Sequence, residues 1–299
     1  MKAVLSYPQH DRFVDPARRS SGLNHTLVGF VAIEFFYAIC RHATDYVIVQ
    51  TLPDLSEEIL SRVTARAMII DLFAFLFLGL TVIWVVWRTH NRGPATLFGP
   101  ASLFWSDLLR ASLGAGALFL VLEFVLPWWR ADHVDMQPLQ AWAATLPLAL
   151  MALLIQTGAE ELFYRGYLQQ QFAARFSNPL VWMTLPNLIF AAVHWYNGSG
   201  FADSATYVLW AFCFGVAASD LVARSGSIGA AIGFHLANNA YAFLMVGERG
   251  APDSGLALFL YPPLPAFEGP EPPILSMALA VDLMVIVLAW LAVRVAIRR

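Results

Sequence analysis

Apolar runs long enough to cross a lipid bilayer recur along this chain from one end to the other. Roughly 20 consecutive apolar residues in a helix cross the hydrocarbon core of a bilayer. Hydrophobic residues make up 59% of the chain and charged residues only 13%, whereas soluble proteins carry about 25% charged residues. The sequence therefore predicts an all-α, polytopic integral membrane protein and excludes a soluble one.

Eight of these runs are predicted to be membrane-spanning helices, separated by loops with proline, glycine and charged residues. The predicted spans are residues 26–49, 67–87, 107–128, 141–172, 180–196, 205–223, 227–247 and 273–296. No internal repeat relates the two halves of the chain, so an inverted-repeat transporter has no direct support. We treat residues 1–299 as a single membrane domain.

The charges of the loops predict the orientation. Arginines crowd the N-terminal tail, the even-numbered loops and the C-terminus, whereas the alternate loops are mainly acidic. By the positive-inside rule both termini are cytoplasmic, and an even number of spans agrees with this. Lys2 is the only lysine, which favours a GC-rich bacterial genome and hence the bacterial inner membrane. The net charge of −3, without a basic block, gives no reason to expect nucleic acid as a partner.

Two adjacent carboxylates and an arginine interrupt the fourth predicted span. Glu160, Glu161 and Arg165 follow the apolar run 142–155 with no polar linker between them. A charged residue at the centre of a membrane helix costs roughly 2.5–3.5 kcal/mol, so such groups pair with each other or serve a function. Glu161 and Arg165 are spaced i, i+4 and can form an ion pair on one helix face. Glu160 points about 100° away and is left to face something else.

Polar pairs also interrupt two later spans. The fifth span contains His194, and the seventh contains His235 and Asn239, which share a helix face. If the fourth helix continues unbroken, Glu160 and His194 both lie about 24 Å from the turn that joins their helices. His235 reaches the same level if the fourth helix extends about 12 Å into the cytoplasm. The polar run Gln169–Gln171 near the end of that helix suits such an extension.

These groups place a carboxylate, two imidazoles and an amide at one depth in the membrane. A desolvated glutamate can take a proton from water with the help of a neighbouring histidine. A second histidine and an asparagine can donate hydrogen bonds to a developing oxyanion. Such a set hydrolyses an acyl bond, and at this depth the natural substrate is a peptide bond of a membrane-associated protein or peptide. The expected partners are this substrate and the lipid bilayer.

The same residues resemble the motifs of the CPBP intramembrane protease family, which includes the CAAX prenyl endopeptidases and the bacterial Abi proteins. The motifs are Glu160-Glu161-x-x-x-Arg165, Phe190-x-x-x-His194 and His235-x-x-x-Asn239, in this order on successive helices. The resemblance covers about residues 141–247 and implies that they form the catalytic core of a CAAX-prenyl-protease-like helical bundle.

The resemblance also implies a role for each motif residue. Glu160 and His194 would activate the water, and the enzyme would be a glutamic endopeptidase. His235 and Asn239 would hold the oxyanion. Glu161 and Arg165 would brace the site as an ion pair. The substrate itself cannot be chosen from the resemblance, since prenylated peptides, signalling peptides and C-terminal sorting tails all fit a site of this kind.

No cofactor is favoured, but two alternatives stay open. Glu160, His194 and His235 would make an acceptable zinc set, so a zinc-dependent version of the same protease is one of them. The His-Glu-x-x-His signature of zinc peptidases is absent. A proton-coupled membrane transporter is the other, with the same three residues as a proton relay. Asn239 does not titrate and argues against a relay. A further interpretation is a non-catalytic protein that binds a partner helix in its cavity.

The remaining polar residues of the spans are expected to be structural. Interhelical hydrogen bonds are expected for three carboxylates: Glu34, Asp71 and Glu123. Asp220 and Arg224, spaced i, i+4, are expected to form a local ion pair. Gln156 and Asn238 flank the motifs and are expected to support the residues beside them.

Overall fold

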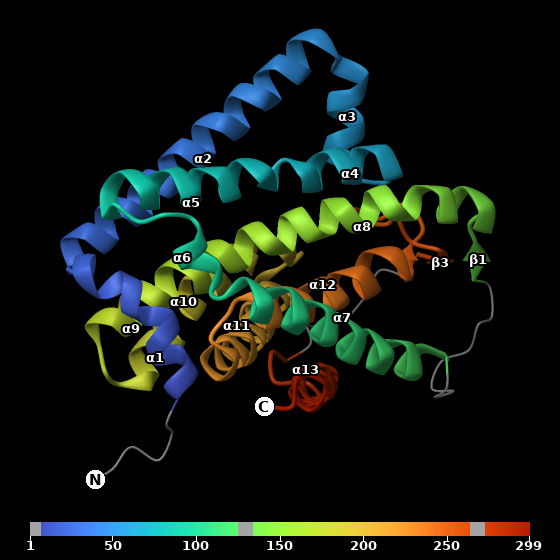
Figure 1. The fold of residues 1–299 in the computed structure, drawn as a ribbon. Helices are drawn as coiled ribbons and strands as arrows, with labels where there is room; N and C mark the ends of the chain where they lie inside the picture. The colour runs from blue at the N-terminus through green and yellow to red at the C-terminus, as the bar shows by residue number, and fades with distance from the viewer. Residues whose placement is uncertain (1–6, 125–133, 264–272) are drawn as a thin grey trace.

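The computed structural model describes residues 7–124, 134–263 and 273–299, and these residues are largely helical (Figure 1). The helices in chain order are α1 (Pro8–Val14), η1 (Asp15–Ser20), α2 (Leu23–Thr51), α3 (Pro53–Ser61), α4 (Ala65–Phe73), α5 (Phe75–His90), α6 (Ala95–Phe98), α7 (Ala101–Phe124), α8 (Leu139–Glu161), η2 (Leu162–Gln169), α9 (Gln170–Arg175), α10 (Pro179–Val193), η3 (His194–Asn197), α11 (Phe201–Ser225), α12 (Gly229–Leu244) and α13 (Met277–Ile297). Of these, η1 and η3 are 3₁₀-helices and η2 is a π-helix.

Within the described residues, five helical segments are long and apolar enough to cross a membrane: Leu23–Thr51, Ala65–His90, Leu139–Arg175, Phe201–Ser225 and Met277–Ile297. The predicted all-α membrane class is therefore confirmed. The count of eight spans is not confirmed and stays a prediction. The helices α10 and α12 have only 15 and 16 residues, and charged residues interrupt the apolar run of α7. The last residues of the third predicted span, 125–128, lie outside the described residues.

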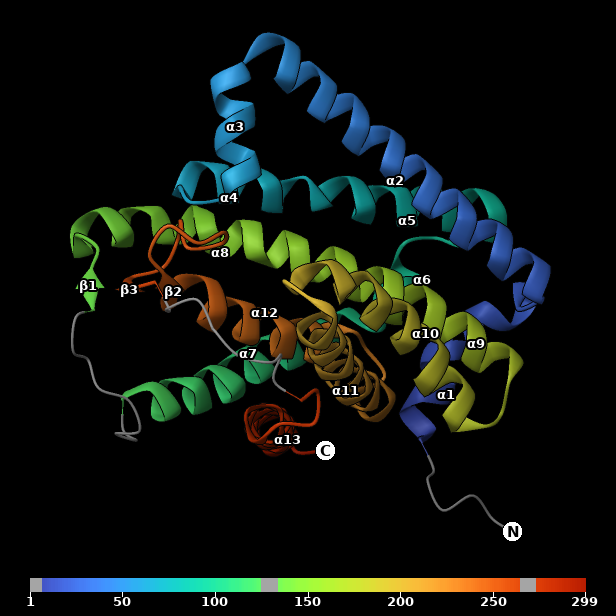
Figure 2. The ribbon, with the colours of Figure 1, turned by 180° about the vertical axis from the view of Figure 1, so that it is seen from behind.

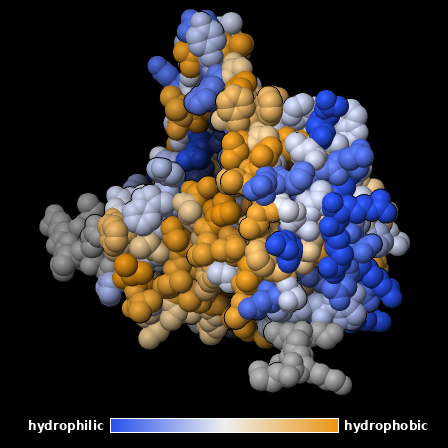
Figure 3. Space-filling view, turned by 90° about the vertical axis from the view of Figure 1, so that its left-hand side faces the viewer, coloured by the Kyte–Doolittle hydropathy of each residue, from blue (hydrophilic) through white to orange (hydrophobic). Residues whose placement is uncertain are grey.

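The helices run in two main directions. Figures 1 and 2 show α5, α7 and α8 lengthwise, whereas α11 and α13 are seen end-on and cross them. The buried residues of α2 all lie in its first half, at Thr26, Gly29 and Ile33. Toward its end α2 diverges from α5, and α3 returns the chain to α4, so this end of α2 and α3 form an arm (Figure 1). On the face shown in Figure 3 apolar side chains adjoin a hydrophilic area, as expected of a protein partly in lipid.

Three short strands tie the start of α8 to the end of α12. The central strand β3 (Phe259–Tyr261) pairs antiparallel with β1 (Asp135–Met136) and parallel with β2 (Val246–Glu248). The indole N–H of Trp142 on α8 lies 3.1 Å from the carbonyl oxygen of Leu256 in the loop before β3. Trp142 thus holds this end of the fold together.

Two glycines of α12 allow the helix to approach α7 closely. A Cβ atom at Gly229 would clash with the carbonyl oxygen of Phe104, and one at Gly233 with that of Leu108. A Cβ at Gly233 would also lie 2.8 Å from the Cβ of Ala111. Gly-x-x-x-Gly spacing is a common means of close helix packing in membranes. The contact holds the part of α12 that carries the third motif against α7.

The N-terminal segment α1–η1 packs on the end of the bundle formed by α9. It covers Gln169–Gln171, whose three side chains are fully buried. The side-chain amide of Gln170 donates to the carbonyl oxygen of Phe13 at 2.6 Å, and the hydroxyl of Tyr7 donates to Asp220 at 2.9 Å. The side chains of Gln169–Gln171 therefore do not form an exposed polar helix end, and the extension of this helix into the cytoplasm stays a prediction.

His10 is buried in the same interface. Its ring lies 4.3 Å from that of Trp182 on α10, and its Nε2 lies 3.2 Å from the amide nitrogen of Gln169. Burial, with a smaller contribution from Arg18, lowers the pKa of His10 to about 3. The neutral imidazole is therefore the form that fits the interface.

We expect acidification to loosen the segment 7–20. The pKa of His10 is about 3 when docked and 6.5 ordinarily, so the docked state is fully stabilised above pH 6.5 and is weakened as the pH falls toward 3. The opening equilibrium should rise by up to about tenfold per pH unit in this window. Hydrogen–deuterium exchange of residues 7–20, corrected for the intrinsic pH dependence of exchange, measures it. The variant His10→Gln should lose this dependence, and its persistence would contradict the role of His10.

Candidate active site

The helix that carries the two glutamates changes its winding directly after them. The α-helix α8 ends at Glu161, the π-helix η2 follows, and α9 continues to Arg175. All eight residues of η2 are buried. Turns of π-helix are rare and occur often at functional sites. The predicted continuous helix over 141–172 is correct in extent but missed this change, which alters how Arg165 is placed relative to the glutamates.

Glu161 forms the ion pair expected from its spacing, and it also contacts a third motif residue. Its Oε1 lies 2.8 Å from Nη1 of Arg165 and 2.9 Å from Nδ1 of His235. Glu161 and Arg165 are both fully buried. A carboxylate without water needs such donors, because burying an unpaired charge is very unfavourable. One oxygen thus links the first motif to α12.

The guanidinium of Arg165 extends the network to α10 and α11. Its Nη2 donates to Oδ1 of Asn187 at 3.0 Å and to the carbonyl oxygen of Gly215 at 3.1 Å. The amide nitrogen of Asn187 donates to the hydroxyl of Ser219 at 2.8 Å. A Cβ at Gly215 would lie 2.6 Å from Oδ1 of Asn187, so only glycine leaves room for this contact.

Sequence reasoning missed Asn187, Gly215 and Ser219. Asn187 is a polar residue in an apolar helix, and this feature is a signal by which the sequence could have identified it. Gly215 and Ser219 stand on α11 with spacing i, i+4, which places them on one face. No local pattern links that face to Arg165, so only the packing of α10 and α11 shows the connection.

Glu160 is separated from this network, as its position on the helix predicts. Its side chain is 16% exposed, and its Oε2 lies 3.7 Å from Nε2 of His235. Arg165, the partner of Glu161, makes no ion pair with Glu160 among the described residues. The two adjacent carboxylates therefore have different surroundings, one enclosed by donors and one open to the site.

His194 reaches the site from the end of α10. The helix ends at Val193, and His194 begins η3, so the predicted span 180–196 ends in a tighter turn at the motif. Nδ1 of His194 lies 2.8 Å from the carbonyl oxygen of Phe190 and donates to it, because a carbonyl only accepts. The Phe190 ring lies 4.6 Å from the ring of His194 and 6.2 Å from that of His235. It thus separates the two imidazoles.

Asn239 is held by the side chains of Gln156 on α8 and of its neighbour Asn238. Its amide nitrogen donates to Oε1 of Gln156 at 2.9 Å, and its Oδ1 accepts from the amide of Asn238 at 3.1 Å. Gln156 and Asn238 thus contact the motif residue that they were expected to support. An amide nitrogen has two hydrogens, so one N–H of Asn239 remains after the bond to Gln156.

The other polar residues of the spans differ in their surroundings. Asp220 and Arg224 form the expected ion pair at 2.7 Å. Glu123 accepts a hydrogen bond of 2.6 Å from the hydroxyl of Tyr241, which is an interhelical bond as expected. Asp71 accepts a hydrogen bond of 3.1 Å from Arg41 of α2, which is an interhelical bond as expected and also an ion pair. Glu34 has no hydrogen-bond or ion-pair partner in the described part of the chain, so the expectation of an interhelical bond for it is not met.

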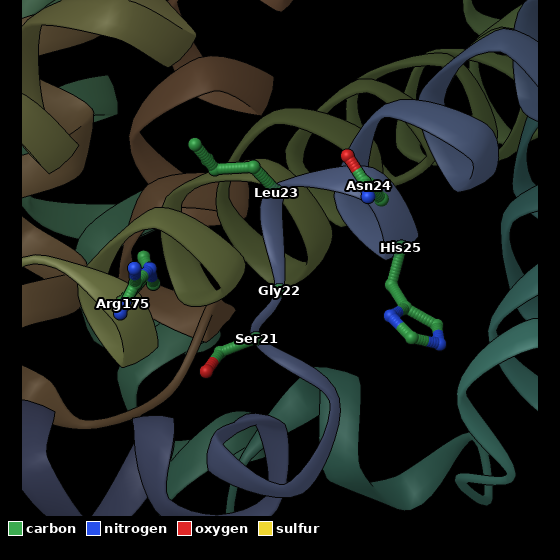
Figure 4. Close-up of a pocket in the computed structure, with 6 residues that line it drawn as sticks. All are labelled: Ser21, Gly22, Leu23, Asn24, His25 and Arg175. Atoms are coloured by element: carbon green, nitrogen blue, oxygen red, sulfur yellow. The ribbon is translucent and has the colours of Figure 1, made fainter.

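A pocket of about 400 Å³ lies away from the motifs. It is lined by Ser21, Gly22, Leu23, Asn24, His25 and Arg175, between the start of α2 and the end of α9 (Figure 4). No motif residue lines it. Among the residues that the structure describes, no group of three or more His, Cys, Asp and Glu side chains is arranged to hold a metal ion. The zinc alternative therefore gains no support from this geometry, and the absence of a cofactor stays a prediction.

We expect the variant Arg165→Met to lose about 3–5 kcal/mol of stability, because it leaves the buried carboxylate of Glu161 without its cation. Arg66→Met is the matched control, since Arg66 pairs with Glu58 on the surface, where an ion pair contributes about 0–1 kcal/mol. Unfolding midpoints in detergent measure both. The double variant Glu161→Gln/Arg165→Met should recover part of the loss. Equal stability of Arg165→Met and Arg66→Met would contradict the bracing role.

Residues 142–241 match the family model described as type II CAAX prenyl endopeptidase Rce1-like. This range contains all three motifs, from Glu160 to Asn239, and about a third of the chain. The members of this family are intramembrane proteases, so the match supports a hydrolase that acts on peptide bonds. That residues 141–247 form a catalytic core stays a prediction.

One curated relative is similar over a longer stretch. The uncharacterized protein YyaK of Bacillus subtilis (strain 168) is 29% identical over 218 residues, which cover 68% of this chain and 69% of the relative. The comparison with solved structures gave no match. The family match rests on the segment that holds the motifs, and it confirms the resemblance to the CPBP proteases. Residues 142–241 thus match the family of Rce1-like type II CAAX prenyl endopeptidases, and this match supports an intramembrane protease.

Proposed function

We propose that this protein is a glutamate-type intramembrane endopeptidase that hydrolyses a peptide bond of a membrane-associated protein or peptide. The observation that carries the proposal is the different surroundings of the adjacent carboxylates. Glu161 accepts from Arg165 at 2.8 Å, whereas among the described residues Glu160 forms no ion pair with an arginine and its Oε2 lies 3.7 Å from Nε2 of His235. A carboxylate kept free of an arginine at this depth can act as a base.

In the first step Glu160 and His194 would activate a water molecule. Because Nδ1 of His194 donates to a backbone carbonyl, its neutral ring presents the lone pair of Nε2. The water would be held between this nitrogen and the Glu160 carboxylate, which would accept its proton as the oxygen attacks the peptide carbonyl. The product of this step is a tetrahedral intermediate with a negative oxygen.

His235 and Asn239 would stabilise that oxygen. Asn239 has one N–H left to donate. Since Nδ1 of His235 donates to Glu161, Nε2 can donate only when the ring carries both protons. The carboxylates of Glu160 and Glu161 are the counter-charges beside such a ring. In the last step the C–N bond would break, and the proton taken from water would pass to the leaving nitrogen, which yields a carboxylate and an amine.

The proposal also includes the extent of the membrane domain, its membrane and its orientation. We infer one membrane domain over residues 1–299, in the bacterial inner membrane, with both termini in the cytoplasm. The distribution of arginines among the loops supports this orientation.

We expect Glu160→Gln and His194→Ala to lower cleavage by about 10²–10⁴-fold, as loss of a general base does. Asn239→Ala should cost about 10²–10³-fold, as loss of an oxyanion donor does. Expression in bacteria, followed by labelling of new N-termini in the membrane proteome, measures cleavage of whichever membrane protein is the substrate. The control Glu57→Gln changes an exposed carboxylate of α3 and should behave as wild type. The same set of new termini with wild type and Glu160→Gln would refute the proposal.

We expect full activity after treatment with a chelator, because no step above needs a metal ion. Purified protein is dialysed against the chelator, its metal content is measured, and cleavage of a substrate from the proteome experiment is compared before and after. Recovery of activity only on addition of zinc would instead favour the metal-dependent version, with Glu160, His194 and His235 as ligands.

A further inference from the structure

The side of α2 that faces the rest of the protein carries polar residues. Phe30, Glu34, Tyr37 and Arg41 recur with spacing i, i+4, i+7 and i+11, and each is partly buried; they are called the inner stripe here. The opposite side of the same stretch is apolar and exposed, with Phe35, Phe36, Ile39, Val47 and Val49. In a bilayer the apolar side faces lipid, so the inner stripe faces the bundle.

Both ends of the inner stripe contact the bundle. The ring of Phe30 stacks on that of Phe163 in η2, with centroids 5.9 Å apart and planes 9° from parallel. At the other end, Nη1 of Arg41 lies 3.1 Å from Asp71 of α4. Glu34 and Tyr37 lie between these contacts and therefore face the segment that begins at the two glutamates.

The middle of the stripe is close to the proposed base. Tyr37 of α2 and Tyr164 of η2 each interact electrostatically with both Glu34 and Glu160. Figure 3 shows a recess between the arm and the body of the molecule, with hydrophilic atoms in its depth. Polar side chains that face inward in a membrane protein usually line a water-filled path or pair with one another.

Glu34 is the member of this stripe for which the described residues supply no partner. Asp71, by contrast, lies 3.1 Å from Arg41 and 4.0 Å from Arg62. Arg41 also lies 3.6 Å from Asp45, so its charge is balanced. A half-buried carboxylate in a membrane protein is stabilised most by a cation placed beside it.

We propose that Glu34 is a specificity-determining residue that binds a basic side chain, lysine or arginine, of the substrate close to the cleaved bond. The inference rests on the proposed endopeptidase function. Phe30 and Arg41 hold the helix against the bundle, and Glu34 supplies the negative charge that a peptide meets as it approaches Glu160. Peptides with an acidic residue at the same position would face two carboxylates and bind poorly.

The experiment compares cleavage sites in the membrane proteome for wild type, Glu34→Gln, Glu34→Lys and Glu160→Gln. Labelled new N-termini give the residues on both sides of every cleaved bond. With wild type, lysine and arginine should be enriched at one position by about tenfold over acidic residues. Glu34→Gln should bring this ratio toward one. Glu34→Lys should invert it, which a loss of folding cannot do. The control Glu57→Gln should leave the ratio unchanged.

The possible results separate the two proposals. Loss of all protein-dependent termini in Glu160→Gln, together with an inverted ratio in Glu34→Lys, supports both. Wild-type cleavage without a charge preference, or a preference that persists in both Glu34 variants, overturns the role of Glu34 and leaves the protease intact. Termini that persist in Glu160→Gln overturn the proposed function and the inference with it.

Discussion

The buried carboxylate of Glu161 connects side chains from several helices, and these helices meet at this point because of it. It accepts from Arg165 on its own helix and from His235 on α12, and Arg165 in turn reaches α10 and α11. A carboxylate and a guanidinium with no exposure to water are tolerated only when their donors and acceptors are in place. The arrangement of these helices is therefore coupled to the satisfaction of one ion pair. The same arrangement positions the preceding residue, Glu160, and leaves its carboxylate without an arginine partner among the described residues.

The helices that carry the histidines are short, and this shortness suits a site inside the bundle. The helices α10 and α12 have only 15 and 16 residues, and His194 directly follows the end of α10. The glycines Gly229 and Gly233 compensate by packing α12 directly on the backbone of α7. Close backbone contact thus holds the short helix α12 in place, and the partly buried side of α2 carries Glu34, Tyr37 and Arg41.

Several features of the site follow from local spacing and were predicted. The ion pair of Glu161 with Arg165, the separation of Glu160 from it and the pair Asp220–Arg224 depend on the 3.6-residue turn, which sequence reasoning handles well. The prediction that Glu160 and His194 lie at one level came from counting residues on each side of one turn, whereas the level of His235 needed an assumed extension of the fourth helix. The π-helix could not be predicted in this way, because its hydrogen bonds depend on how η2 packs. The contacts of Asn187 with Arg165 and of residues 7–20 with Gln169–Gln171 join segments far apart in the chain, and no periodicity encodes them.

The sequence by itself determined that this chain is a helical membrane protein, which residues are too polar for their place in a span, and which of them share a helix face. Composition and helical spacing are local properties, and a bilayer permits few structures for an apolar chain. Only the tertiary structure decided which polar groups satisfy one another. It paired Glu161 with His235, placed Glu160 beside the same imidazole and left Glu34 without a partner among the described residues, since these relations depend on distances between helices. The two adjacent glutamates look alike in the sequence, and their surroundings across the bundle make them different.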